Sequence, residues 1–339
     1  MNKIRIHLLA TLIILLFANC SNEKGRSISN IKNASFGKSQ ISRGNNNPNS
    51  IIGEENVDVL LVSMFYGKSI EEIKKALGWE DPKMQETIDL LIENGFLTEN
   101  NGVYTPTVFV LPLKEGIALK KESNLIANEI SDSIVAILGE FKELHNKMDI
   151  SKQVSFNDLS FFYLSDIILD VGQIGNVESL FLKKERPLRN GKNFYFAILE
   201  KDITKKEEPF GIYGNQGLLN NDSNNDSIYI GVYGNTRSQA DWADYKNKEV
   251  YSFSKNDYSI LFNEFNKKFL PTLINILEKN NTEFLKLFNE YGYSEKISFE
   301  EFFIWYYHLI YTEATNELIK KKVINKPENG LFYYEIIGA

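Results

Sequence analysis

The sequence is poor in the residues that most often mark a metal or redox site. It has one cysteine, Cys20, and three histidines in 339 residues. A single thiol excludes an intramolecular disulfide, so packing must stabilise the fold. Only two histidines, His145 and His308, lie beyond the N-terminal segment, and this excludes a histidine-rich zinc site. We therefore expect neither a bound metal nor a cofactor.

Near its N-terminus the sequence has an apolar run that is too short to cross a membrane. The run covers 8–18, which is 11 residues with Thr11 as the one polar member, whereas a transmembrane helix needs about 20. Lys3 and Arg5 precede this run and Cys20 follows it closely. A positive segment, a short apolar segment and a cleavage site, in that order, are typical of a signal peptide.

The end of this segment, Leu16-Phe17-Ala18-Asn19-Cys20, resembles a bacterial lipobox, with Asn19 in place of the usual small residue. The resemblance implies removal of residues 1–19 and attachment of a diacylglyceryl group, and so of acyl chains such as palmitate, to Cys20. It predicts a lipoprotein anchored in a membrane of the cell envelope. Because Ser21 and Asn22, not an acid, follow the cysteine, the outer membrane is favoured. An ordinary signal peptide or an uncleaved membrane anchor remains the alternative.

The chain has no excess of positive charge to offer an anionic partner. Its net charge is −7, and removal of Lys3 and Arg5 with the signal segment leaves −7 − 2 = −9. An acidic body is a poor electrostatic partner for nucleic acid. We expect the membrane to be reached through the lipid, no nucleic acid to bind, and the partner to be a protein or a small polar ligand.

Residues 20–50 are rich in asparagine and serine and hold few apolar side chains. This composition predicts a flexible tether between the lipid and the globular part.

Residues 51–112 predict a compact helical module. The mostly apolar segment 57–65 predicts a first helix, the capping box Ser69-Ile70-Glu71-Glu72 a second, and Asp81-Pro82, with Asp81 as the cap, a third. A hairpin with its turn at Asn100-Asn101-Gly102 follows. This order of elements resembles a winged-helix module. Its four lysines and eleven acids argue against contact with DNA.

The rest of the chain predicts an α+β domain. An apolar stripe between Leu119 and Leu144 indicates a long helix within a connecting segment, 113–150. In the domain 151–339, strand-like segments predict an antiparallel sheet flanked by helices. They are 177–182, 194–199, 210–213, 228–233 and a final strand at 331–337. The capping box Ser298-Phe299-Glu300-Glu301 predicts an aromatic, largely buried helix through Lys322.

A repeated motif marks the candidate ligand site. Gly211-Ile212-Tyr213-Gly214-Asn215 is echoed by Gly231-Val232-Tyr233-Gly234-Asn235, and polar residues follow at once. Hairpin turn chemistry explains such a repeat by itself. The alternative is a ligand rim, since aromatic rings, amides and charges suit a polar small molecule. The candidate residues are Tyr213, Asn215, Tyr233, Asn235, Arg237, Asp241 and Trp242.

Motifs of the well-known enzyme classes are missing from the sequence. It has no nucleophile elbow, no glycine-rich phosphate loop and no H-E-x-x-H motif. We therefore predict a non-enzymatic binding or interaction lipoprotein. The alternative is an envelope hydrolase that uses a carboxylate pair drawn from Asp166, Asp170, Asp241 and Asp244, because two close carboxyl groups divide acid and base roles.

Overall fold

The structure is a computed structural model that describes residues 26–42, 55–205, 208–221, 227–236 and 245–337. The chain divides into two compact units. The first is Met1–Ala34 with Asn49–Thr107, and the second is Ser35–Pro48 with Val108–Ala339. The fold is α+β, as predicted, because helices flank sheets of mainly antiparallel strands. Cys20 and the signal segment lie outside the described residues.

The described part of the first unit holds a group of short helices and one hairpin. The elements are α2 (Ile28–Lys32), α3 (Val57–Phe65), α4 (Ile70–Leu77), α5 (Asp81–Glu93), β2 (Leu97–Asn100) and β3 (Val103–Pro106). The predicted capping box begins α4, with Ser69 N–H donating to Glu72 at 2.9 Å and Glu72 N–H donating to the Ser69 hydroxyl at 3.3 Å. Asn101 and Gly102 turn the hairpin at φ 53° and 78°.

One detail of this unit differs from the prediction. The N-cap of α5 is Glu80, not Asp81, and it makes no capping hydrogen bond with its side chain. Asp81 lies in the first turn, where its carboxylate pairs with Lys74. The helices and the hairpin follow the predicted order, and the resemblance to a winged helix remains a prediction.

The predicted tether is wrong for part of its length. Ser27 caps α2 by accepting a hydrogen bond from Asn30 N–H at 3.2 Å, and Ile31 is fully buried. The next residues form β1 (Ser35–Ile41), which pairs antiparallel with β7 (Tyr195–Lys201). The local composition does not indicate this strand, because its hydrogen-bonding partner lies about half the chain away in sequence. Residues 43–50 of the predicted tether lie outside the described residues.

The second unit, over its described residues, contains two larger sheets. In the first, β1 and β4 (Phe109–Leu111) flank β7, and β4 runs parallel to it. The second has the order β10-β11-β9-β8, with β10 parallel to β11 and the other pairs antiparallel. Its strands are β8 (Tyr213–Asn221), β9 (Ser227–Asn235), β10 (Val250–Phe253) and β11 (Leu331–Ile337). A small hairpin, β5 (Leu188–Arg189) with β6 (Lys192–Asn193), turns at Asn190-Gly191, as predicted.

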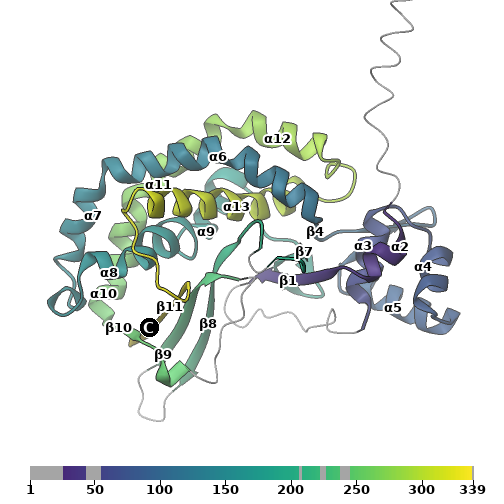
Figure 1. The fold of residues 1–339 in the computed structure, drawn as a ribbon, viewed down its shortest axis with the longest axis horizontal. Helices are drawn as coiled ribbons and strands as arrows, with labels where there is room; N and C mark the ends of the chain where they lie inside the picture. The colour runs from purple at the N-terminus through teal and green to yellow at the C-terminus, as the bar shows by residue number, and fades with distance from the viewer. Residues whose placement is uncertain (1–25, 43–54, 206–207, 222–226, 237–244, 338–339) are drawn as a thin grey trace, which may run out of the picture. The chain divides into compact units, whose positions relative to one another are not determined.

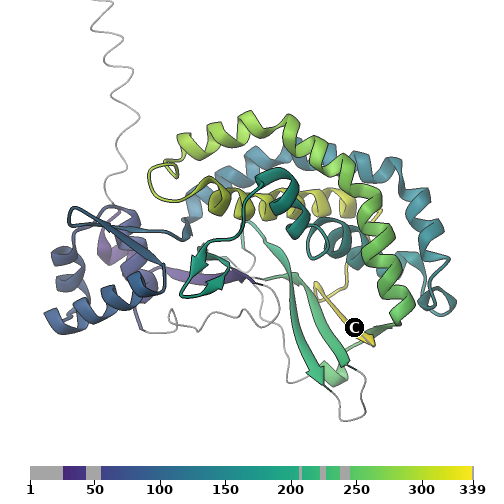
Figure 2. The ribbon, with the colours of Figure 1, turned by 180° about the vertical axis from the view of Figure 1, so that it is seen from behind.

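Helix α13 (Phe299–Lys320) forms the centre of this unit. It is buried along most of its length, as its aromatic sequence predicted, and Ser298 caps it. Helix α6 (Leu113–Ala136) lies along it and belongs to the core of this unit, and α7 (Leu138–His145) follows α6. Figures 1 and 2 show from opposite sides that α6, α12 and α13 form a layer from which the β8–β9 hairpin extends. The other helices are α8 (Phe156–Phe161), α9 (Ile174–Asn176), α10 (Lys255–Ile260), α11 (Asn266–Lys279) and α12 (Asn281–Glu290).

Three helices in the described part of this unit contain π-helical turns: η3 (Phe162–Ile167), η4 (Val177–Leu182) and η6 (Leu261–Phe265). The strand predicted over 177–182 is therefore wrong, because a short apolar run fits a strand and a helix equally well. The strand predicted over 210–213 is also misplaced, since β8 begins at Tyr213 and continues to Asn221. π-Helical turns occur frequently at functional sites.

Candidate functional site

The two copies of the repeated motif lie at the same end of one hairpin. One copy begins β8 and the other ends β9, and the register pairs Tyr213 with Asn235 and Asn215 with Tyr233. Because paired positions share a face and alternate residues return to it, all four side chains lie on one side of the hairpin. Asn215 and Asn235 therefore lie at the same end of the hairpin instead of a strand length apart.

The motifs are not turns, since Tyr213–Asn215 begin β8 and Gly231–Asn235 end β9. Neither asparagine and none of the four motif glycines has a positive φ. Close packing instead explains why at least one of these positions must be glycine. A side chain at Gly231 would collide with the ring of Tyr334. Turn chemistry, the simpler explanation of the repeat, does not account for it.

The tyrosines of the motif point into the core of the second unit. Tyr213 N–H donates to the Thr312 hydroxyl at 2.9 Å, and the Tyr213 hydroxyl donates to Asn316 Oδ1 at 3.0 Å, so α13 holds the start of β8. The Tyr233 hydroxyl lies 2.5 Å from that of Ser165 in η3. Both tyrosines are buried. They line the interior instead of a surface rim.

The motif asparagine of β8 joins this interior to a pair of acids. Asn215 Nδ2 donates to Asp166 Oδ2 at 2.6 Å and contacts the Tyr334 hydroxyl, while its Oδ1 accepts from the Tyr229 hydroxyl at 3.0 Å. Asp166 lies in η3, and Asp170 follows one turn later, with its N–H donating to the Asp166 carbonyl at 2.9 Å. Asp166 exposes none of its surface and Asp170 exposes 5%. The structure thus joins two separate sequence predictions, the motif and the acid pair, in one buried cluster.

Burial dominates the electrostatics of this cluster. It raises the pKa of Asp166 well above the ordinary range, and the negative charge of Asp170 raises it further. Burial also raises the pKa of Asp170 to about 7, against the opposing effect of hydrogen bonds from Tyr311 and from the Asn215 backbone. Within the described part of the chain, Asp166 Oδ1 and Asp170 Oδ2 are buried without a hydrogen-bond partner. Such oxygens favour the protonated, neutral form of a carboxyl group.

His308 contacts the acid pair but does not form an ion pair with it. Its Nε2 lies 3.9 Å from Asp170 Oδ1, and its Nδ1 donates to the Ile304 carbonyl at 2.6 Å. Burial lowers the pKa of His308 to about 4, so the ring is neutral at the pH where Asp170 ionises. The two carboxyl groups can therefore hold protons. When they ionise, His308 supplies no positive charge to balance them.

The remaining predicted site residues cannot be placed with this cluster. Arg237, Asp241, Trp242 and the alternative acid Asp244 lie outside the described residues. The cluster also includes side chains that sequence reasoning missed, among them Tyr229, Tyr334 and Tyr311. The sequence indicated these residues only through its high aromatic content, which does not show which tyrosines come together in the fold.

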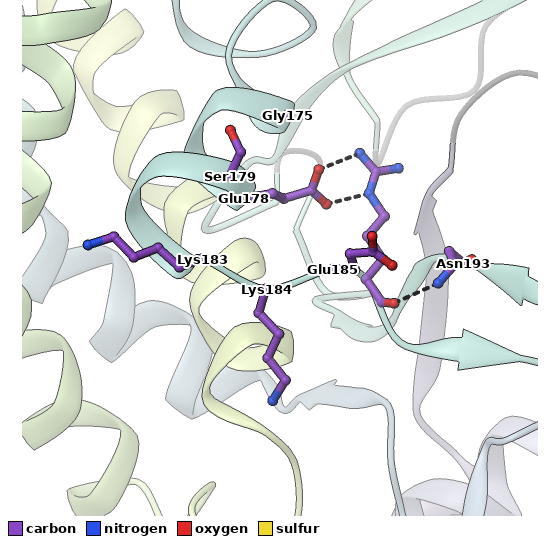
Figure 3. Close-up of a pocket in the computed structure, with 8 residues that line it drawn as sticks. Gly175, Glu178, Ser179, Lys183, Lys184, Glu185 and Asn193 are labelled. Carbon is purple, nitrogen blue, oxygen red and sulfur yellow. Dashed lines mark hydrogen bonds and ion pairs between the residues drawn. The ribbon is translucent and has the colours of Figure 1, made fainter.

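A pocket on the surface of the second unit lies between η4 and the β5–β6 hairpin, with a volume of about 550 Å³. Figure 3 shows Glu178 in its wall. The Glu178 carboxylate pairs with the Arg186 guanidinium, and Arg186 Nη2 lies 3.1 Å from Glu178 Oε2. Lys183 and Lys184 point away from this pair (Figure 3), and Lys184 pairs with Glu300 at 3.1 Å. Because the cations diverge, the pocket does not form a cradle for an anion.

Comparison with known proteins assigns the chain to no family. No family model, curated protein or solved structure matches this chain. In the part of the chain that the structure describes, no three histidine, cysteine or acidic side chains gather as a metal site would require. Among the same residues, no helix combines the length and apolarity needed to cross a membrane.

Proposed function

We propose that this protein is a lipoprotein of the bacterial cell envelope, anchored through Cys20 in the outer membrane, that binds a protein or a polar ligand without catalysing a reaction. The lipobox-like segment and the absence of an acid directly after Cys20 support the anchor and its membrane. The acidic body supports a partner other than nucleic acid or anionic lipid.

The observation that supports binding over catalysis is that the acid pair is buried, out of reach of a substrate. A catalytic carboxyl group must come within hydrogen-bond distance of its substrate. Asp166 is fully buried, and Asn215 holds it from the neighbouring hairpin. Buried hydrogen-bonded polar groups of this kind specify packing, which explains the pair without a substrate.

Cell fractionation tests the proposed location. The protein, expressed with its own N-terminus in a bacterium with two membranes, should sediment with the outer membrane on a density gradient. Recovery in the soluble periplasmic fraction, or with the inner membrane, would contradict the corresponding part of the proposal.

The second candidate function is an envelope hydrolase, and one observation favours it. Two adjacent carboxyl groups with raised pKa values, one of them near 7, are what general acid catalysis at neutral pH requires. Asp166→Asn and Asp170→Asn preserve shape and remove the acid. If the protein releases products from a bound polymer, and both variants lose this activity while keeping their thermal midpoints, the hydrolase is correct and the non-catalytic proposal fails.

A further inference from the structure

A groove beside strand β10 offers polar groups around an aromatic ring. Its volume is about 900 Å³. It is lined by β10, by the segment that leads into α8, and by the loop that leads into β11. The side chains that matter here are Tyr251, Phe332, Gln153, Asp158, Asn325 and Lys326. Parallel pairing of β10 with β11 brings these distant segments together.

Tyr251 is the outermost ring of a stack that begins in the core. Its ring centroid lies 4.9 Å from that of Phe332 at an interplanar angle of 5°, and Phe332 lies 5.1 Å from Phe162 at 9°. Phe332 and Phe162 are buried, whereas Tyr251 is half-buried. Because Phe332 covers one face of Tyr251, the exposed part of this ring is its other face and its edge. The buried rings fix its orientation.

Polar groups surround this ring. Asn325 N–H donates to the Ser160 hydroxyl at 2.8 Å, which holds the loop in place. Ser155 donates to Asp158 Oδ2 at 2.6 Å and so orients this carboxylate. Among the described residues, the side-chain amides of Gln153 and Asn325 make no hydrogen bond to protein. Each amide therefore keeps its donors and its acceptor for a ligand.

The charges of the groove nearly balance. Its lining includes two lysines, Lys248 and Lys326, and three acids, Asp158, Glu249 and Glu328. The amino group of Lys326 lies over the ring of Tyr213, 5.6 Å from the centroid. A lining of this kind gives a strongly charged ligand no net attraction, and it favours a neutral one.

We propose that this groove binds a neutral saccharide, one of whose rings stacks on Tyr251 while its hydroxyl groups bond to Gln153, Asn325 and Asp158. A sugar ring has an apolar face of C–H groups and a rim of hydroxyls that donate and accept. An oriented aromatic face surrounded by amides and a carboxylate complements both. This inference rests on the proposed binding function and names its ligand class.

The test uses the whole mature chain with Cys20 replaced by Ala, so that binding is measured without a lipid. Short neutral oligosaccharides of glucose, mannose, xylose and N-acetylglucosamine, with sulfated and uronic-acid oligosaccharides for comparison, are titrated in calorimetry. We expect a neutral oligosaccharide to bind. Binding only of the acidic oligosaccharides, or of none, overturns the inference.

Variants locate the site. Tyr251→Ala should weaken binding by about tenfold or more, and Tyr251→Phe, which keeps the stacked ring, by no more than about threefold. Asn325→Ala, on the exposed loop, should also weaken binding and does not depend on the aromatic stack for folding. Tyr258→Ala, on α10 and outside the lining of this groove, is the control and should bind like the wild type. Unchanged affinity in both Tyr251→Ala and Asn325→Ala would refute the site.

The outcomes separate this inference from the proposed function. A lipidated outer-membrane protein that binds no neutral saccharide contradicts the inference alone. Saccharide binding by a chain that is never lipidated contradicts the anchor alone. Hydrolysis of the bound oligosaccharide would support the groove as a saccharide site. It would overturn the proposal that the protein catalyses no reaction.

Discussion

Asp166 and Asp170 illustrate how burial can change the chemistry of an ordinary residue. Both carboxyl groups lie between η3 and the β8–β9 hairpin, and burial raises both pKa values. A group whose pKa is higher in the folded than in the unfolded state binds its proton more tightly when folded. Protonation therefore stabilises this fold, which is the reverse of the usual effect of a salt-bridged aspartate.

The sign of this linkage gives a prediction about pH. The stabilisation by Asp170 is fully present below its unfolded pKa of about 4 and is lost as the pH rises to its folded pKa of about 7. Within this window the Asp170 contribution to the free energy of unfolding should fall by up to about 1.4 kcal/mol per pH unit. His308 contributes in the opposite direction between its folded pKa of about 4 and its unfolded pKa of about 6.5, so the Asp170 contribution is measured as a difference between two proteins. Asp170→Asn mimics the neutral acid and removes this contribution, so its free energy of unfolding, measured by urea unfolding across the window, should rise with pH relative to that of the wild type.

Asp132→Asn provides the control, because Asp132 is an exposed helical aspartate paired with Lys321. This variant should keep the wild-type slope. An Asp170→Asn variant with the wild-type pH slope would show that Asp170 is ionised in the fold.

At the scale of the element, two helical glycines with different surroundings test the packing of the second unit. A side chain at Gly116 in α6 would collide with the ring of Phe210, whereas nothing lies within 4 Å of one at Gly139 in α7. Gly116→Ala should lower the free energy of unfolding by about 1–3 kcal/mol, because overpacking displaces the ring. Gly139→Ala should raise it by roughly 0.5–1 kcal/mol through helix propensity. Equal effects in urea titrations would contradict the described contact between α6 and Phe210.

The sequence correctly predicted those features that depend on residues close together in the chain. The capping-box patterns at Ser69 and Ser298 predicted helix starts, and Asn101-Gly102 predicted a hairpin, because caps and turns depend on residues a few positions apart. At Ser298 only the N-cap hydrogen bond forms, because the Glu301 carboxylate instead accepts from Phe196 N–H and pairs with Arg189. Strand β1 was missed because only its pairing with β7 makes it a strand. The π-helical turn at 177–182 was missed because its apolar run also fits a strand.

The candidate site was predicted in part, for the same reason. The repeat identified Tyr213, Asn215, Tyr233 and Asn235 as a group, and the pairing of β8 with β9 does bring them together. Their direction was not predictable, because a one-residue change of register moves every side chain to the opposite face. Only the hydrogen bonds to η3 and α13 show that this face is the interior.

At the scale of the whole molecule, the charge gives a prediction about nucleic acid. The full chain carries −7, and the proposed cleavage before Cys20 would leave −7 − 2 = −9. Phosphates therefore repel the protein as a whole, and this repulsion is strongest at low salt. Full-length mature protein should cause no mobility shift of duplex DNA even in low-salt buffer. A complex at micromolar protein that weakens as salt is added would contradict the prediction and favour a DNA-binding role for the predicted winged-helix module.

Lipidation at Cys20 is the central claim, and metabolic labelling with palmitate tests it most directly. Cells that express the full chain should incorporate the label into the wild-type protein, which should sediment with membranes. Cys20→Ala, which lacks the only thiol in the chain, should incorporate no label and should accumulate unprocessed or in the soluble fraction. Equal labelling of the two proteins, or no labelling of the wild type, would contradict the account.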